Sequence, residues 1–191
     1  YINGLTIVIE PRKMFMLSDV TSSKRITTPN KEGICLSKYG DPGYGELVKR
    51  DKYSGKNCFC DELVGKSASV LRQFVEEKGV LYITCVPSLR SNIVADFSKR
   101  LADSLGIQFV ELLEKSATCQ QKDMQNSSHQ CGNAMRSFSL KDDVDIPEKI
   151  LLVDDVVDSK WTLTACGYYL TEGGCQEVYP FALADSSQKE D

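Results

Sequence analysis

The stretch that decides the fold runs from Lys149 to Thr164 and reads Lys-Ile-Leu-Leu-Val-Asp-Asp-Val-Val-Asp-Ser-Lys-Trp-Thr-Leu-Thr. Its four apolar residues, Ile150 to Val153, predict a short strand that is buried on both faces. Asp154 and Asp155 follow where this strand is expected to end, and a polar turn then leads into a helical pattern. Such a turn forms an anion site, because the first turn of a helix leaves backbone N–H groups without helical partners.

The acidic residues beside this turn suggest what the anion belongs to. Carboxylates next to a phosphate would repel it unless they bind something else, and sugar hydroxyls or Mg²⁺ are suitable partners. Asp158, Ser159 and Thr162 add another carboxylate and two hydroxyls just before the helix. The stretch therefore predicts a site for a phosphorylated sugar, with the phosphate on the turn and the sugar hydroxyls on the acid pair.

The order of apolar segments predicts an α/β protein with a mostly parallel sheet flanked by helices. Strands are expected at residues 5–10, 34–36, 80–86, 107–113, 150–153 and 178–184, and helices at 61–78, 92–105 and from 163 to 170. The segments 18–31, 49–57 and 114–138 are polar and are expected to be loops. We expect a small N-terminal extension, residues 1–57, and a main domain, residues 58–191. Because ligands bind beyond the carboxyl ends of parallel strands, the loops 87–91 and 154–162 should face one site.

Composition excludes several classes of protein. The chain has 191 residues, 41% hydrophobic residues and a net charge of −4. It therefore has no overall basic field for indiscriminate nucleic-acid binding, and no apolar run long enough to span a bilayer. Because the chain opens on Tyr1 and not on Met, we expect it to be part of a longer polypeptide with further domains upstream.

Eight cysteines raise the question of disulfides or zinc. Cys85 lies in an apolar strand pattern and Cys166 in a helical one, which suits small buried hydrophobic side chains. Cys58-x-Cys60 has the wrong spacing for a zinc pair, and His129 is the single histidine. We therefore expect reduced, structural cysteines in a cytoplasmic protein.

An acid pair after an apolar strand also occurs in three unrelated settings. Two such acids can be an ordinary solvated strand end. A Walker B strand also ends in acids, but the chain lacks the G-x-x-x-x-G-K-[ST] loop of a complete P-loop ATPase. A response-regulator receiver needs a whole further domain after its early acids, and only about forty residues remain here.

The motifs resemble those of a known family. Ile150 to Thr162 resembles the phosphoribosyl diphosphate (PRPP) signature of type I phosphoribosyltransferases: an apolar strand, two acids, two residues, then Asp-Ser/Thr-Gly-x-Thr. With Thr84-Cys-Val-Pro-Ser-Leu-Arg90 and Gln120-Gln-Lys-Asp-Met-Gln-Asn126, it is similar to the phosphoribosyltransferase-like domain at the C-terminal end of some bacterial RecQ-type ATP-dependent DNA helicases. That domain is itself similar to the ComF group of competence-related phosphoribosyltransferases. Glu10-Pro-Arg-Lys13 and Gly40-Asp-Pro-Gly-Tyr-Gly45 resemble the segment that precedes it in those helicases.

The resemblance implies roles for the residues of the acidic stretch. Asp154 and Asp155 would bind the ribose 2′- and 3′-hydroxyls, directly or through Mg²⁺, and Asp158 would be the carboxylate near the reacting carbon. The 5′-phosphate would lie on residues 157–162, with contacts from Ser159, Lys160 and Thr162. Trp161 would either pack at the helix start or stack on a base.

The resemblance also implies roles for two loops. Pro87, Ser88 and Arg90 would form the pyrophosphate loop, with Arg90 as a bidentate anion contact. Residues 114–138 would be a mobile cover that excludes water from the site, with Lys115 and Lys122 as phosphate contacts.

The expected ligand is thus PRPP or a ribose-phosphate nucleotide, and Mg²⁺ is the expected cofactor. DNA, in a repair context, would be bound only through helicase domains outside this chain; no membrane partner is expected, and a homodimer stays open. The family usually has glycine where this chain has Lys160, which adds a positive charge and a Cβ to the turn. Two classes stay open: an enzyme that transfers phosphoribose between pyrophosphate and an unidentified acceptor, and a regulatory or partner-docking module without turnover, which Lys160 favours.

Overall fold

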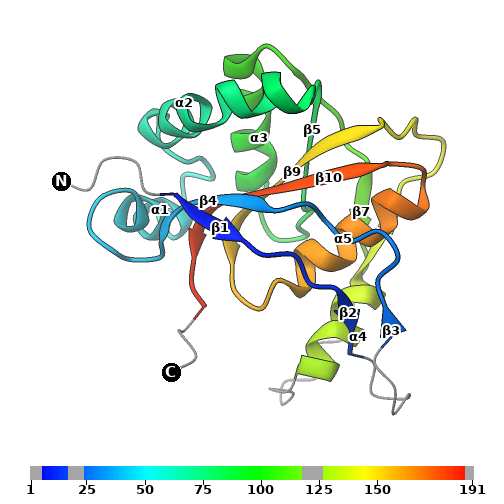
Figure 1. Ribbon diagram of the computed structural model, residues 1–191. Coiled ribbons are helices and arrows are strands. Elements are labelled where there is room, and N and C mark those ends of the chain that lie inside the picture. Colours follow the sequence, from blue (N-terminus) through cyan, green and yellow to red (C-terminus); the bar gives the residue numbers. More distant parts are fainter. Residues whose placement is uncertain (1–5, 17–23, 118–126, 188–191) are drawn as a thin grey trace.

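The computed structural model describes residues 6–16, 24–117 and 127–187, and its centre is a six-stranded sheet in the order β1-β4-β10-β9-β5-β6 (Figure 1). The strands are β1 (Ile7–Ile9), β4 (Gly33–Lys38), β5 (Tyr82–Cys85), β6 (Gln108–Phe109), β9 (Lys149–Val157) and β10 (Glu177–Asp185). All neighbours in this sheet are parallel except β1, which is antiparallel to β4. The predicted α/β class with a mostly parallel sheet is confirmed.

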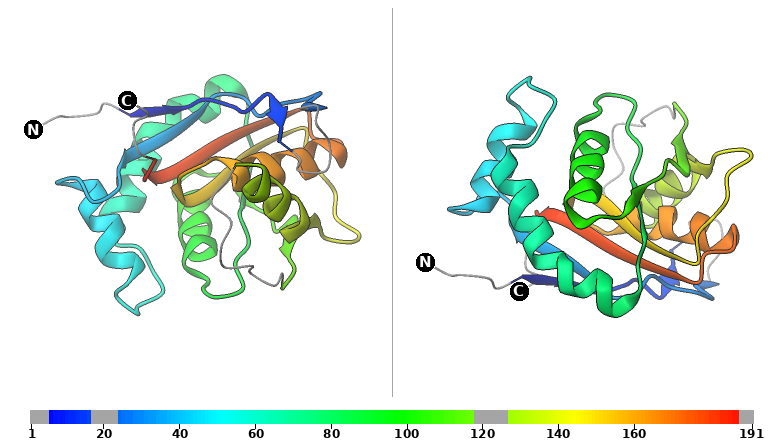
Figure 2. Two further views of the ribbon diagram at one scale, coloured as in Figure 1. Left: turned by 90° about the horizontal axis from the view of Figure 1, so that it is seen from below. Right: turned by 90° about the horizontal axis from the view of Figure 1, so that it is seen from above.

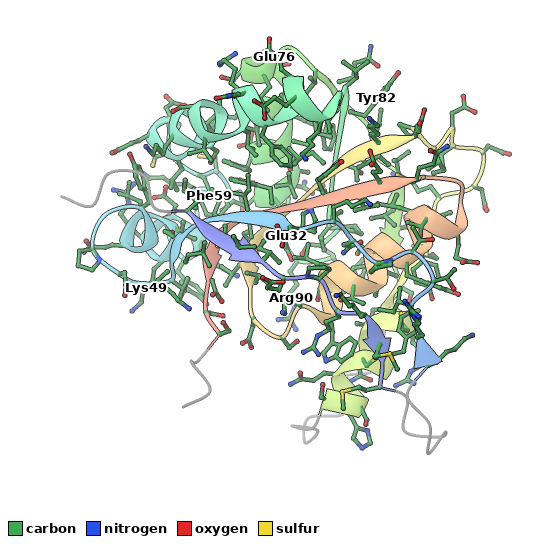
Figure 3. All side chains as sticks on the ribbon, in the orientation of Figure 1. Glu32, Lys49, Phe59, Glu76, Tyr82 and Arg90 are labelled. Carbon is green, nitrogen blue, oxygen red and sulfur yellow. The ribbon has the colours of Figure 1, made fainter. Side chains whose placement is uncertain are left out.

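Helices cover both faces of the sheet (Figures 1 and 2). One face carries α1 (Tyr44–Lys52), α2 (Asp61–Lys78) and α3 (Ile93–Leu105), and the other carries α4 (Ser127–Ser137) and α5 (Trp161–Glu172). Side chains fill the space between the layers, while exposed Glu76 lies on the outer side of α2 (Figure 3). Right-handed crossovers of a parallel sheet produce this three-layer arrangement.

Strand β9 is the middle of the core. Leu151 and Val153 pack into the layer below α2 and α3, whereas Ile150 and Leu152 pack against α5, and all four have no exposed surface. Successive side chains of a strand point to opposite faces, so a continuous apolar run fits a strand that is covered on both sides. Burial of each such side chain contributes about 1.5–3 kcal/mol, so these four residues are a large part of the core.

Two helices end at glycines directly after their predicted ranges. Gly79 and Gly106 both adopt left-handed conformations, with φ of 69°, at the C-termini of α2 and α3. Cys60 occupies the N-cap of α2, and the helix covers the predicted range, with Asp61 as its first residue. The Asp61 carboxylate accepts a hydrogen bond from Arg100.

Several segments that were expected to be loops form regular structure. Helix α1 overlaps the predicted connector, α4 lies in the predicted cover, and β2 (Met14–Phe15) pairs with β3 (Lys24–Arg25). The predicted strand at 107–113 is split, because the chain leaves the sheet after β6 and forms a ribbon of β7 (Leu113–Lys115) with β8 (Phe138–Leu140). These elements are short, and the tertiary contacts of buried residues such as Val48 and Cys131 stabilise them.

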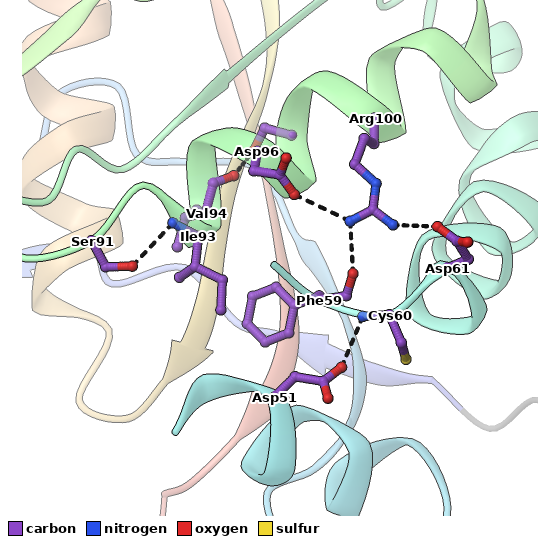
Figure 4. Close-up of polar contacts among 10 residues, drawn as sticks. Asp51, Phe59, Cys60, Asp61, Ser91, Ile93, Val94, Asp96 and Arg100 are labelled. Carbon is purple, nitrogen blue, oxygen red and sulfur yellow. Dashed lines mark hydrogen bonds and ion pairs between the residues drawn. The ribbon is translucent and has the colours of Figure 1, made fainter. Parts of the chain in front are cut away.

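Residues on both sides of position 57 share the main sheet, because β1 and β4 precede it and β4 pairs with β10. A polar network also joins the two parts (Figure 4). Asp51 Oδ2 accepts a hydrogen bond from the Cys60 amide at 2.8 Å. Arg100 on α3 donates to the Phe59 carbonyl at 2.6 Å and to Asp96 at 3.1 Å. The start of α3, and therefore the loop before it, is fixed by contacts from the chain around residue 60.

The cysteines and the helix lengths bear on two further expectations. Seven cysteines in the described ranges are unpaired, namely Cys35, Cys58, Cys60, Cys85, Cys131, Cys166 and Cys175, and Cys119 lies outside the described residues. Among the helices of residues 6–16, 24–117 and 127–187, none combines the length and the apolar character needed to cross a membrane.

Candidate functional site

The bend between β9 and α5 has the predicted strand–turn–helix form. Strand β9 ends at Val157, helix α5 begins at Trp161, and Lys160 occupies the N-cap with φ 68° and ψ 2°. The helix opens with a hydrogen bond from the Thr164 amide to the Lys160 carbonyl at 2.9 Å, and no side chain caps it. The first backbone N–H groups of α5, with the positive end of its dipole, therefore face the bend.

The conformation of Lys160 is left-handed, which is the backbone geometry that favours glycine. A residue with a Cβ adopts this conformation at a cost of about 1–2 kcal/mol, whereas glycine adopts it freely. The Lys160 side chain is anchored, because its Nζ donates to the Glu10 carbonyl at 3.0 Å. The lysine keeps the backbone shape of a glycine loop and adds a tethered positive charge.

A cleft of about 640 Å³ opens beside the bend. The predicted residues Asp158, Ser159 and Lys160 line it. Sequence reasoning missed the residues that the N-terminal segment, α4 and the end of β10 bring to its walls, among them Glu10, Arg12, Gln130, Asp185 and Ser187. Glu10 and Arg12 belong to the segment 10–13 that the sequence singled out, but nothing in that segment placed it beside the bend, because only the tertiary fold brings it there.

Arg12 is held against the bend by two contacts. Its Nε donates to the Ser159 carbonyl at 2.7 Å, and its Cζ lies 3.9 Å from the centre of the Trp161 ring. The guanidinium therefore extends along the bend from residue 159 to residue 161. The planar group is fixed in a cation–π geometry and not left to sample many rotamers.

The acid pair lies inside β9, and the prediction that the strand ends before it is wrong by four residues. Asp155 Oδ2 is 3.1 Å from Lys52 Nζ on α1, and its Oδ1 accepts the Val156 amide at 2.7 Å. Asp154 Oδ1 accepts the Asp155 amide at 2.8 Å. Because side chains alternate along a strand, Asp155 faces the α1 side and Asp154 the α5 side. The strand continues because β10 pairs with it as far as Val157.

Desolvation shifts the pKa of Asp154. The residue is half-buried, and its pKa is raised well above 3.8, first by burial and then by the neighbouring charge of Asp155, since both disfavour ionisation. The two acids therefore differ chemically, because Asp155 is paired with Lys52 and the pKa of Asp154 is raised.

The predicted Mg²⁺ ligands are the same two acids. Magnesium requires oxygen ligands at about 2.0–2.1 Å in octahedral geometry and keeps several waters. Both Asp155 oxygens already have partners, Lys52 and the Val156 amide. Within the described ranges no group of three or more His, Cys, Asp or Glu side chains is placed to hold a metal. The two acids alone therefore do not make a metal site held by protein ligands, and neither of them lines the 640 Å³ cleft or the cleft at the end of β5.

A second cleft, of about 250 Å³, lies at the end of β5. Pro87, Ser88 and Lys115 line it, so the predicted pyrophosphate loop and one predicted phosphate contact come together. Ser88 Oγ accepts the Arg90 amide at 3.2 Å and shapes the loop. Arg90 lines neither of the two clefts, and Lys122 lies outside the described residues.

Trp161 packs at the start of α5 and has 2% exposure. Its indole Nε1 donates to Ser127 Oγ on α4 at 2.9 Å, so it joins the two helices. Of its two expected alternatives, packing is the one that this placement favours. Thr162, the next residue, is half-buried in the first turn of the helix.

Comparison with known proteins gives one similar curated sequence and several loosely similar folds. No family model matches the chain. It is 27% identical over 157 residues to the competence protein ComFC of Streptococcus pneumoniae, covering 80% of this chain and 70% of ComFC.

The structural overlaps are with phosphoribosyltransferases and an enzyme of purine biosynthesis. A Staphylococcus aureus hypoxanthine phosphoribosyltransferase overlaps with TM-score 0.45 and 12% identity, covering 65% of this chain and 64% of that one. A Saccharomyces cerevisiae adenine phosphoribosyltransferase overlaps with TM-score 0.43 and 16% identity, covering 66% of this chain and 70% of that one. The allosteric regulatory enzyme of purine biosynthesis overlaps with TM-score 0.42 and 23% identity. The overlap covers 63% of this chain and 24% of that enzyme. These overlaps are loose, but the similarity to ComFC agrees with the ComF-like, phosphoribosyltransferase-like resemblance of the stretch from Lys149 to Thr164.

Proposed function

We propose that this chain is a ComF-like phosphoribosyltransferase-like domain that binds PRPP or a ribose-phosphate nucleotide at the carboxyl edge of its sheet. The observation that carries the proposal is the left-handed bend at Lys160, which connects a buried strand to an uncapped helix N-terminus beside a 640 Å³ cleft. Backbone N–H groups in such a bend bind phosphate. The similarity to ComFC supports the same assignment.

The two clefts suggest how the ligand would lie. The 5′-phosphate would occupy the bend, and the diphosphate would reach the smaller cleft, whose charged residues are Lys115, Lys141, Glu111 and Glu114. Lys141 is paired with Glu111 at 3.1 Å, so Lys115 is the proposed diphosphate contact there. The ribose between them would face the carboxyl ends of β9 and β5, which are adjacent parallel strands. Mg²⁺ would enter with the diphosphate, whose oxygens supply the ligands that the acid pair lacks.

The chemistry of phosphoribosyl transfer suits these residue types. Loss of pyrophosphate builds positive charge on the anomeric carbon and negative charge on the leaving group. Carboxylates near the sugar and cations near the diphosphate stabilise both charges. Asp158, an exposed carboxylate on the bend, is the proposed group nearest the reacting carbon. The regulatory alternative uses the same binding site without turnover.

Calorimetry tests the binding proposal. The 191-residue chain is titrated with PRPP in the presence and absence of Mg²⁺, together with Asp155→Asn and, as a matched control, Asp142→Asn on the exposed surface. Loss of the Asp155 charge should weaken binding about tenfold or more, because hydrogen bonds to charged groups contribute about 1.5–3 kcal/mol. No measurable binding of PRPP to the unmodified chain would refute the proposal.

A second assay separates the enzyme from the regulatory module. Exchange of radiolabelled pyrophosphate into PRPP is measured with each candidate base or amine. Exchange with one acceptor supports an enzyme, and tight PRPP binding without exchange supports a regulatory module.

The helicase context is a separate part of the proposal. It is supported only by the resemblance of residues 10–13, 40–45, 84–90, 120–126 and 150–162 to segments of RecQ-type helicases. Any DNA repair role would then depend on the helicase domains that bind DNA. The coding sequence on both sides of this segment decides the point, since helicase motifs are either encoded there or not.

A further inference from the structure

We propose that Arg12, from the N-terminal segment, is a phosphate-binding residue of the ribose-phosphate site and sets its preference for phosphorylated over unphosphorylated sugars. This inference rests on the proposed function and adds a residue that no motif of the 149–164 stretch contains. It stands on three observations: the position of the guanidinium on the bend, the charges of the cleft and the anchoring of Lys160.

The position of Arg12 suits a phosphate on the bend. Its guanidinium touches the Ser159 carbonyl and the Trp161 ring, which belong to the two residues on either side of Lys160. A phosphate bound to the first amides of α5 would lie beside this group. Arginine binds phosphate through parallel N–H donors, and the stacking on Trp161 holds the plane of the donors before the ligand arrives.

The charges of the 640 Å³ cleft favour a role for Arg12 in anion binding. Its described charged residues are Glu10, Arg12, Asp158, Lys160 and Asp185. Asp185 is paired with Lys38 at 2.9 Å, which leaves two acids and two cations. Without Arg12, only Lys160 would oppose the two carboxylates, and the cleft would repel a dianionic phosphate.

The N-terminal segment and the bend hold each other. Lys160 Nζ donates to the Glu10 carbonyl, while Arg12 Nε donates to the Ser159 carbonyl, so each segment supplies a cation to the backbone of the other. The left-handed bend is therefore supported from residues about 150 positions away in the sequence. Residues 10–12 complete the phosphate site and are not an independent appendage.

The test compares ligands that differ only in the phosphate. The 191-residue chain and the variants Arg12→Ala, Arg12→Gln and Arg12→Lys are titrated with ribose 5-phosphate and with ribose. Arg72→Ala is the matched control, because Arg72 is an exposed arginine on α2 that likewise donates to one backbone carbonyl, that of Ser104. Arg12→Ala and Arg12→Gln should weaken ribose 5-phosphate binding about tenfold to a hundredfold, while Arg72→Ala stays within about twofold.

A direct phosphate contact and a merely structural role give different results. A direct contact makes the affinity of the unmodified chain for ribose 5-phosphate fall more steeply with salt than that of Arg12→Gln, and Arg12→Lys recovers part of the loss because it keeps the charge. If Arg12→Ala does not fold by circular dichroism, Arg12→Gln and Arg12→Lys decide the result.

The outcomes that overturn the inference are also distinct. Affinity of Arg12→Gln equal to that of the unmodified chain overturns the role of Arg12 and leaves the proposed function intact. Failure of the unmodified chain to bind either PRPP or ribose 5-phosphate overturns the proposed function, and this inference with it.

Discussion

Replacement of Lys160 by glycine or alanine tests the geometry of the bend directly. Lys160 has φ 68° and ψ 2°, a conformation that costs a residue with a Cβ about 1–2 kcal/mol and glycine almost nothing. Both substitutions remove the hydrogen bond from Nζ to the Glu10 carbonyl, so that loss cancels when the two variants are compared. Their difference isolates the backbone term.

The expected magnitude follows from two opposing terms. Relative to Lys160→Ala, the glycine variant gains about 1–2 kcal/mol of stability because the left-handed backbone is no longer strained. It loses about 0.4–1 kcal/mol because glycine gives the unfolded chain more conformational freedom. The glycine variant should therefore be about 1 kcal/mol more stable than Lys160→Ala. Ser69, which is exposed in the middle of α2, gives the control pair: there glycine should be about 1 kcal/mol less stable than alanine.

Urea unfolding followed by circular dichroism at the helix band measures all four variants. Circular dichroism is preferred to fluorescence because the single tryptophan, Trp161, is the neighbour of the mutated residue. The slopes with urea should be equal, so that midpoints report stability alone. If glycine is less stable than alanine at position 160, as it should be at position 69, the left-handed bend is refuted, and with it the geometric basis of the phosphate site.

Three further predictions concern the acid pair, the Arg100 network and the cysteines. Burial raises the pKa of Asp154, so the native state holds a proton that the unfolded chain releases above about pH 4, and native stability falls as the pH rises from there. Asp154→Asn should therefore gain stability relative to the unmodified chain as the pH rises above about 4, and a pH-independent difference in urea midpoints would contradict this. Arg100→Ala should lower the free energy of unfolding by about 2 kcal/mol, because it leaves the Phe59 carbonyl and two carboxylates without their donor. Arg100→Lys should recover part of this loss in urea unfolding, and a stability of Arg100→Ala equal to that of the unmodified chain would contradict the prediction. Burial raises the thiol pKa of Cys35 and Cys85 to about 12, so Ellman's reagent at about pH 8 should label exposed Cys58 in the native protein and these two only after unfolding; mass-spectrometric mapping checks the assignment.

The sequence predicts the regular elements well wherever the pattern is long or punctuated. The glycines after α2 and α3 mark both helix ends, and the apolar run from Ile150 to Val153 marks the central strand. The sequence fails where a neighbouring strand decides the outcome. Pairing with β10 extends β9 through the acid pair to Val157, although aspartate is a poor strand residue.

The predicted site divides in the same way. The bend at residues 158–160 and the loop at 87–88 lie at the predicted edge because the polar segments follow adjacent parallel strands. The contacts of Lys52 and Arg12 could not be found from the sequence, since each residue reaches its partner from a different part of the chain across the fold. Side-chain contacts between distant segments leave no local pattern.

From its residues alone, the chain specifies a strand buried on both faces and a polar bend leading into a helix, because burial and helix-end chemistry are written in local patterns. The charge balance around that bend is decided only by the tertiary structure. The tertiary fold brings Arg12, which follows β1, to the bend after β9. It also places Lys52 of α1 against Asp155. Electrostatic interactions depend on distances of a few ångströms, and those distances are set by packing between segments far apart in the sequence.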